Sequence, residues 1–212
     1  MEITWLGHSC FRIKGKEATI ITDPFDKTLG YPLKKLNASI VTVSHQHPQH
    51  SNTEVVEGDP KIISKPGEYE VANVFIQGFA TFHDGERGEK RGKNIVYLIH
   101  LEDINICHLG DLGHIPATYQ IEQLGDTDIL MVPVGGVSTI DATAAAETVR
   151  LLQPRLVIPM HYKTGMVKMQ LDPVDLFLKA MALKEIVPQP KLSLNKSSLP
   201  EGTSVVILDY PS

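Results

Sequence analysis

Hydrophobic and polar residues alternate with a short period along the first half of the chain. Runs rich in Val, Ile and Thr and bounded by Gly, Pro or Asp are typical of strands. Such runs cover residues 2–7, 10–15, 18–24, 39–45, 61–64, 73–82, 94–103 and 104–111. Residues 67–70 lie between two of them and are interpreted as a tight turn, with a loop at the rim of a site as the alternative. This half therefore predicts short strands joined by turns.

The second half of the chain changes to a longer period. Residues 117–124 predict a short helix, and residues 141–153 a longer one with Asp141 as N-cap and Pro154 as the stop. Residues 129–134 and 156–161 are continuous apolar runs, which are typical of strands buried on both faces. A further helix is predicted from Asp172, its N-cap, and Pro173, its first residue, to about residue 183, and a closing strand over 205–210. The strand–helix–strand succession is a βαβ unit, so the whole pattern predicts a layered α/β fold.

The composition narrows the class of protein. With 42% hydrophobic residues and no biased tract, the chain is not a disordered or low-complexity protein. No stretch poor in apolar residues divides the sequence, which predicts one domain over residues 1–212. Lys and Arg number 20 against 25 Asp and Glu, a net charge of -5. This balance argues against a general nucleic-acid binder, because such proteins need clustered positive charge.

Several features predict a soluble, cytoplasmic protein without a membrane partner. No apolar run approaches the ~18–20 residues of a membrane span. The N-terminal residues lack the basic region and the long apolar region of a secretory signal. Cys10 and Cys107 lie in separate apolar stretches, and we interpret them as buried reduced thiols rather than as a disulfide framework.

Three histidines within six residues carry the clearest chemical signal. His45, His47 and His50 follow the apolar run 39–43, where a buried strand emerges into a loop. In an extended segment, residues i and i+2 point the same way, so His45 and His47 can offer two imidazoles to one ion. A turn after Pro48 can return His50 to the same cleft. Imidazole is a preferred ligand of Zn and the later transition metals, so the cluster predicts a metal site, with a His-rich polar loop as the alternative.

Other imidazoles and carboxylates stand where predicted strands end. His83 and Asp84 follow the run 73–82, Asp111 ends the run 104–111, and His161 ends the run 156–161. Each of them alone is more often a cap or a surface residue. Because parallel strands end on one edge of a sheet, the group as a whole predicts a common cleft. His114 lies three residues beyond Asp111.

A series of motifs runs along the chain in the order WLGHS at 5–9, DPF at 23–25, HQHPQH at 45–50, GEYE at 67–70, His83, GD at 110–111, PVGG at 133–136 and PMHY at 159–162. These motifs resemble those of the metallo-β-lactamase superfamily. The resemblance is greatest to its group of metal-dependent hydrolases that includes ascorbate-6-phosphate lactonase-like proteins. It extends over nearly the whole chain, and it is specific for the superfamily and the fold rather than for a substrate.

The resemblance implies a four-layer αβ/βα sandwich with mixed sheets and a metal site at one edge of them. It also implies an enzyme that uses Zn, as one or two ions, with Mn or Fe as alternatives. The implied ligands are His45, His47 and His83 for a first ion, His50 and His161 for a second, and Asp111 as the bridge. Asp111 and His50 are accordingly the candidate catalytic residues, and His108 is interpreted as structural.

Residue 49 departs from the family pattern. The family cluster reads His-x-His-x-Asp-His, and Gln49 stands where the Asp belongs. In the family that Asp binds the second metal and orients the attacking water, whereas an amide is a poorer ligand and accepts no proton. We therefore hypothesise a mononuclear or only partly dinuclear site. The alternative is that Asp84 or Glu68 supplies the missing carboxylate.

Further residues are predicted to lie around the ligands. The candidates for a supporting position beside the metal are His8, Gln49, His114 and Tyr162, of which the two histidines and the tyrosine are candidate general acids. For His8, a structural strand–turn pair with Ser9 is the alternative. The charged stretch 84–93 is interpreted as solvated surface, with a lid or a handle for an anionic substrate as the alternative, through Arg87, Lys90, Arg91 and Lys93.

The leading functional hypothesis is a metal-dependent hydrolase that uses metal-activated water on a small ester, lactone or phosphate-bearing metabolite. The same superfamily supports phosphodiesterase or nuclease chemistry, which the net charge of -5 disfavours. Because Gln49 stands in place of the family's Asp, the third hypothesis is a non-catalytic metal-binding protein. The expected partner is a small molecule and not a nucleic acid, and the sequence leaves open whether the chain forms a homo-oligomer.

Overall fold

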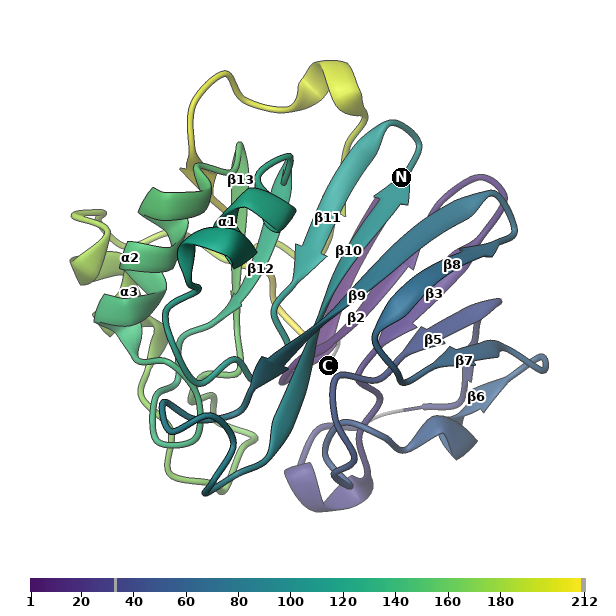
Figure 1. The fold of residues 1–212 in the computed structure, drawn as a ribbon, viewed down its shortest axis with the longest axis horizontal. Coiled ribbons are helices and arrows are strands. Elements are labelled where there is room, and N and C mark those ends of the chain that lie inside the picture. The colour runs from purple at the N-terminus through teal and green to yellow at the C-terminus, as the bar shows by residue number, and fades with distance from the viewer. Residues whose placement is uncertain (33, 211–212) are drawn as a thin grey trace.

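Two mixed β-sheets lie against each other at the centre of the computed structural model, which describes residues 1–32 and 34–210 (Figure 1). The six-stranded sheet runs in the order β14 (Leu192–Ser193), β1 (Glu2–Gly7), β2 (Cys10–Lys14), β3 (Thr19–Thr22), β5 (Ile40–Thr42) and β7 (Lys61–Ile63). Residue 33 and residues 211–212 of the predicted domain lie outside the described residues.

The seven-stranded sheet carries the helices. Its order is β15 (Ser204–Val205), β13 (Leu156–Met160), β12 (Ile129–Pro133), β11 (Ile104–His108), β10 (Lys93–Leu101), β9 (Val74–Phe82) and β8 (Gly67–Val71). Figure 1 shows α1 (Thr118–Leu124), α2 (Ala142–Leu152) and α3 (Val174–Ala180) on the outer side of this sheet. A short parallel pair, β4 (Leu36–Asn37) and β6 (Val56–Glu57), lies beside the other sheet.

Burial of apolar side chains explains this layering. One cluster fills the space between the sheets and continues under the helices, with Ile13, Ile99 and Phe177 among its fully buried members. A second cluster, which includes Phe25 and Leu29, lies on the outer face of the six-stranded sheet. Each such side chain contributes about 1.5–3 kcal/mol when it is fully buried. In the described residues, that outer face is covered by loops and short 3-10 turns such as Lys27–Leu29, whereas α-helices cover the seven-stranded sheet.

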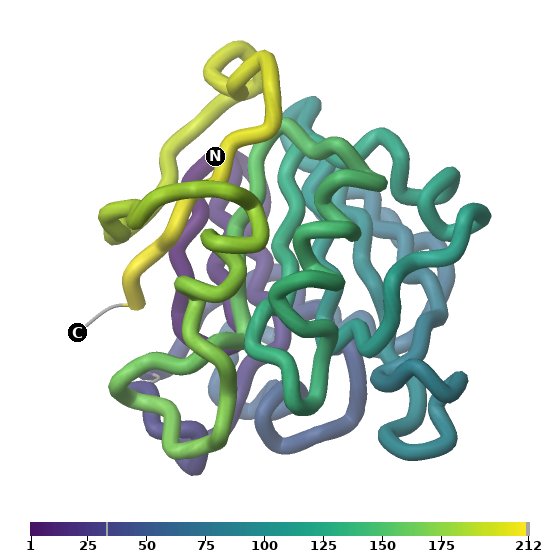
Figure 2. Tube along the Cα trace, turned by 90° about the vertical axis from the view of Figure 1, so that its left-hand side faces the viewer, coloured from purple at the N-terminus to yellow at the C-terminus, as the bar shows by residue number. Residues whose placement is uncertain are grey.

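The direction of the strands brings several of their carboxyl ends together. Strands β3 and β5 pair in parallel in one sheet, and β11, β12 and β13 pair in parallel in the other. The two sheet edges are joined where the amide of His161, after β13, donates to the carbonyl of His8, after β1, at 3.1 Å. Figure 2 shows the purple N-terminal strand beside the yellow C-terminal segment, and β1 pairs there with β14. The loops after these strands therefore share one side of the molecule.

Most predicted elements are confirmed, together with the layered α/β architecture with mixed sheets. Strands β12 and β13 are buried along their whole length, as their continuous apolar runs predict. Helix α2 begins after Asp141, whose side chain accepts a hydrogen bond from the amide of Ala144 at 2.8 Å. Cys10 and Cys107 are free and buried. None of the helices in the described part of the chain is long and apolar enough to span a membrane.

The prediction for residues 67–70 is wrong. They belong to strand β8, which pairs with β9, and the hairpin turn lies instead at Ala72 and Asn73, whose φ angles are 50° and 59°. Positive φ at both central residues is the geometry that matches the twist of a two-residue hairpin.

Two boundaries near the C-terminus also differ from the prediction. Helix α3 begins at Val174 and ends at Ala180, with Pro173 rather than Asp172 as the cap, because both backbone groups of Asp172 bond to loop residues. The closing strand covers only Ser204–Val205. Beyond it the chain leaves β13, and Leu208 forms a bridge with Gln189.

Candidate metal centre

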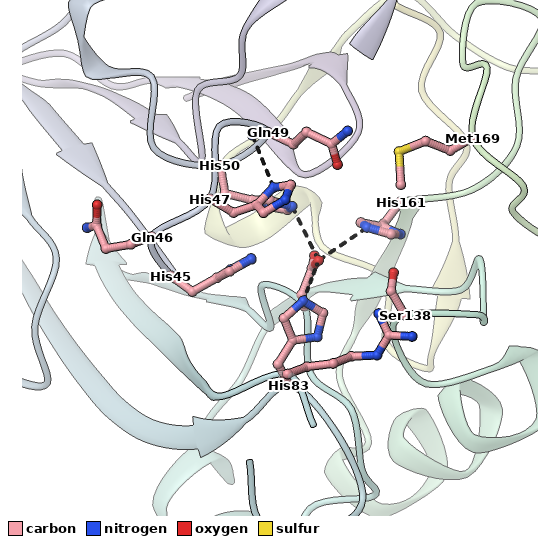
Figure 3. A pocket seen from close by; sticks show the side chains of 11 residues that line it. His45, Gln46, His47, Gln49, His50, His83, Ser138, His161 and Met169 are labelled. Atoms are coloured by element: carbon pink, nitrogen blue, oxygen red, sulfur yellow. Dashed lines mark hydrogen bonds and ion pairs between the residues drawn. The ribbon is translucent and has the colours of Figure 1, made fainter. Parts of the chain in front are cut away.

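Histidines from both sheets line a pocket of about 310 Å³ at the shared edge (Figure 3). The loop after β5 contributes His45, His47 and His50, while His83 follows β9 and His161 follows β13. Asp111 follows β11 and enters from the same side. The remaining lining residues are Gln46, Gln49, Arg91, Ser138 and Met169. The structure thus brings together the six residues that the sequence nominated as ligands.

Asp111 lies at the centre of this group. Its Oδ2 atom is 3.2 Å from Nε2 of His50 and 3.3 Å from Nε2 of both His83 and His161. Burial by itself raises the pKa of Asp111, but His161 and His50 outweigh it and hold this pKa well below its usual range. The carboxylate is therefore ionised, and it faces three imidazole nitrogens from three different strands.

Asp23, which comes directly after β3, sets the orientation of two of the histidines. Its Oδ2 accepts hydrogen bonds from Nδ1 of His50 at 3.0 Å and from the hydroxyl of Ser44 at 2.6 Å. Because that hydroxyl gives its proton to Asp23, it accepts from Nδ1 of His45 at 3.0 Å. Both imidazoles thus carry a proton on Nδ1 and direct Nε2 toward the pocket. Orientation of this kind is what ligating histidines require.

The chemistry of the donor set fits a metal ion. The ligand atoms of His45, His83 and Asp111 lie within 4.8 Å of one another, and so do those of His8, His50 and His161. Burial lowers the pKa of His45 to about 4, so its lone pair is free at neutral pH. In the protein without an ion, burial also lowers the pKa of His50, but Asp111 and Asp23 outweigh it and raise that pKa to about 10.

His47 and Gln49 also line the pocket (Figure 3). His47 is exposed, and its ring centroid is 6.0 Å from that of His45. Gln49 is half-buried, and its backbone N–H donates to Nδ1 of His47 at 3.3 Å. His108 has the structural environment that the sequence suggested, because it is buried and its Nε2 bonds to the carbonyl of Ser9 at 2.8 Å.

Two residues that were expected beside the metal lie elsewhere. His114 lines a separate cavity next to Phe82. Tyr162 is buried and stacks on Trp5 with ring centroids 5.0 Å apart. Both follow pocket residues closely in sequence, but the backbone turns after Asp111 and His161 and directs their side chains away from the pocket. Neither side chain therefore lines the histidine pocket.

The two acids considered as substitutes for the missing carboxylate are engaged elsewhere. Glu68 is exposed on β8 and accepts from Nε2 of Gln77 at 3.2 Å. Asp84 closes the loop that follows His83 by accepting hydrogen bonds from four backbone amides, those of Glu86, Gly88, Lys90 and Arg91. These hydrogen bonds outweigh the effect of burial and lower the pKa of Asp84 to about 2.

The same loop brings a cation to the pocket. Among the basic residues of the stretch 84–93, Arg91 is the one that lines it, and its Nη2 atom donates to the carbonyl of Val137 at 3.0 Å. Lys90 instead pairs with Glu86. Of the basic residues that the sequence offered for binding an anionic substrate, the described pocket therefore contains the Arg91 guanidinium alone.

Comparison with known proteins agrees with this geometry. Residues 2–161 match the β-lactamase superfamily domain. The structure also aligns, with a TM-score of 0.83 and 42% identity over 99% of both chains, with a protein from Thermotoga maritima assigned as a Zn-dependent hydrolase of the metallo-β-lactamase superfamily. The chain belongs to the metallo-β-lactamase superfamily.

Two further proteins are similar to this chain along most of their length. A metal-dependent hydrolase of the UPF0173 family from Thermoplasma volcanium is 30% identical over 220 residues, which cover 91% of this chain and 96% of the relative. A metallo hydrolase from Ignicoccus hospitalis is 20% identical with a TM-score of 0.64, over 92% of this chain and 99% of that chain, and shares the fold. These relationships place the chain among the metal-dependent hydrolases of the superfamily.

Proposed function

We propose that this metal-dependent hydrolase uses Zn to cleave a small anionic ester, lactone or phosphate-bearing metabolite. The observation that carries the proposal is Arg91, a cation at the rim of a pocket otherwise lined mainly by histidines around Asp111. The pocket volume of about 310 Å³ is at the lower end of the range for ligand sites and suits a metabolite rather than a polymer.

The proposed ligands are His45, His47 and His83 for one ion and His50 and His161 for a second, with Asp111 between them. An ion held by these residues would lower the pKa of a water to about 7 and would polarise the bond to be cleaved. Asp23 keeps the Nε2 lone pairs of His45 and His50 directed at that position. The buried carboxylate of Asp111 balances the positive charge on one side, while Arg91 attracts the anionic group of the substrate on the other.

The loop around Asp84 prepares Arg91 for this role. Its backbone is ordered before substrate arrives, because the amide of Arg91 already donates to Asp84 at 2.7 Å. An ordered loop reduces the entropy that binding has to overcome. A guanidinium can form two parallel hydrogen bonds with a carboxylate or a phosphate, so it favours substrates that carry such a group.

The proposal is tested with a panel of small esters, lactones, phosphate monoesters and phosphodiesters, assayed with Zn or Mn. Arg91→Met should raise KM about tenfold or more for the anionic substrates that are cleaved, since a hydrogen bond to a charged group contributes about 1.5–3 kcal/mol. It should leave kcat and the hydrolysis of neutral analogues nearly unchanged. Arg150→Met is the matched control, because Arg150 is exposed on α2 and pairs with Glu147.

The other outcomes identify the competing functions. Equal loss on neutral and anionic substrates would refute the role of Arg91 in substrate selection. Cleavage of RNA or DNA in preference to small molecules, with strong salt dependence, would favour the nuclease hypothesis. A protein that binds Zn but cleaves none of these substrates would support the non-catalytic alternative.

A further inference from the structure

His8 is a buried imidazole without a hydrogen-bond partner on either ring nitrogen in the part of the chain that the structure describes. Its exposed fraction is 0%, and both Nδ1 and Nε2 are unpartnered. A neutral imidazole has one N–H donor and one lone pair, and a buried polar group that is left unpaired costs about 1–3 kcal/mol.

The ring of His8 is fixed against two histidines of the metal pocket. Its centroid is 3.9 Å from that of His161 and 4.9 Å from that of His50. The carbonyl of His8 accepts hydrogen bonds from Nε1 of Trp5 at 2.8 Å and from the amide of His161 at 3.1 Å. These bonds hold His8 at a φ of 55°, a left-handed conformation that is unfavourable for a residue with a side chain. Such strain is typical of functional positions.

We propose that His8 is a metal ligand, which completes a second cation site with His50 and His161. The ligand atoms of the three histidines lie within 4.8 Å of one another. Three imidazoles are a donor set for zinc or a similar transition metal.

Asp111 supplies the fourth group of this second site. Its Oδ2 atom lies against Nε2 of two of the three histidines, His50 at 3.2 Å and His161 at 3.3 Å. The same carboxylate also belongs to the neighbouring group with His45 and His83. One carboxylate would therefore be shared by two adjacent ions.

The third imidazole changes the expectation drawn from residue 49. The second site gains a protein ligand from the turn after β1, and this ligand does not depend on the loop after β5. A neutral side chain at position 49 is therefore compatible with a dinuclear centre. We therefore expect two ions per chain, and the inference concerns metal binding alone and not the substrate.

The test compares the wild type with His8→Phe and His8→Asn after the metal has been removed and Zn added back. Phe keeps a ring against His161 without a nitrogen, and Asn tolerates the left-handed backbone. Zn per chain is measured by elemental analysis after removal of loose metal, and the number of imidazoles per ion by X-ray absorption. The melting temperature is recorded with and without Zn.

We expect two Zn per chain in the wild type and one in both variants, with the affinity for the second ion reduced about 100-fold or more. Without metal, His8→Phe should melt at or above the wild-type temperature, because it removes two unpaired polar atoms. One Zn in the wild type, or two in the variants, would overturn the inference. A variant that is destabilised without metal yet keeps the second ion would also overturn it, because that result is expected if His8 has a purely structural role. Failure to find a substrate would affect only the proposed function.

Discussion

Replacing Asp23 with Asn should weaken metal binding without altering any residue that faces the pocket. The carboxylate accepts three hydrogen bonds, from the amide of Ser44 at 2.7 Å, from its hydroxyl at 2.6 Å and from Nδ1 of His50 at 3.0 Å. An Asn side chain keeps one oxygen, for the amide of Ser44. Its NH2 group faces the other two partners and cannot accept from them.

The expected consequence is a change of tautomer. An NH2 group that donates to Nδ1 of His50 favours the proton on Nε2, which then presents an N–H to the pocket instead of a lone pair. The hydroxyl of Ser44 also loses its acceptor and can donate to Nδ1 of His45, with the same result. Loss of a group that orients a ligating histidine typically lowers metal affinity 10–100-fold, which corresponds to about 1.4–2.7 kcal/mol.

Zn affinity can be measured by competition with a chromophoric chelator on protein first stripped of metal. Asp59→Asn is the matched control, because Asp59 is exposed and also has a positive φ, 56° against 38° for Asp23. Circular dichroism verifies that both variants are folded. If folded Asp23→Asn binds Zn within about twofold of the wild type, the orientation argument is wrong.

Three further changes test other parts of the structure. Tyr97→Phe should lower the free energy of unfolding by about 1–2 kcal/mol, because the buried hydroxyl donates to the carbonyls of Val43 at 2.9 Å and Ile63 at 3.0 Å. An unchanged midpoint in urea titrations would contradict this. Asp84→Asn should speed amide exchange at residues 86–91 and raise KM for anionic substrates, and an equally protected loop would refute the role of this carboxylate. Gln49→Asp should tighten the second Zn about tenfold or more by adding a negative charge at the rim; an unchanged affinity would mean that residue 49 does not reach the ion.

The sequence by itself predicted most of the strands, the main helix and the place of the histidine-lined pocket. Period-2 runs and continuous apolar runs follow from which faces of a strand are buried, and they are read without knowledge of the partner strand. His45, Asp111 and His161 were recognised because each stands where such a run ends. The ends of parallel strands meet at one edge whatever the details of packing.

Only the tertiary structure decided which polar groups support the pocket. Asp23 and His8 act through contacts with residues far away in the chain, and no local pattern records which buried nitrogen has a partner. Arg91 is distinguished from its basic neighbours by the turn around Asp84. His114 was excluded by the direction in which the backbone leaves its strand. Hydrophobic periodicity indicates the burial of one residue at a time. Hydrogen bonding and metal coordination depend instead on the relative positions of several residues, and these positions are set only when both sheets pack together.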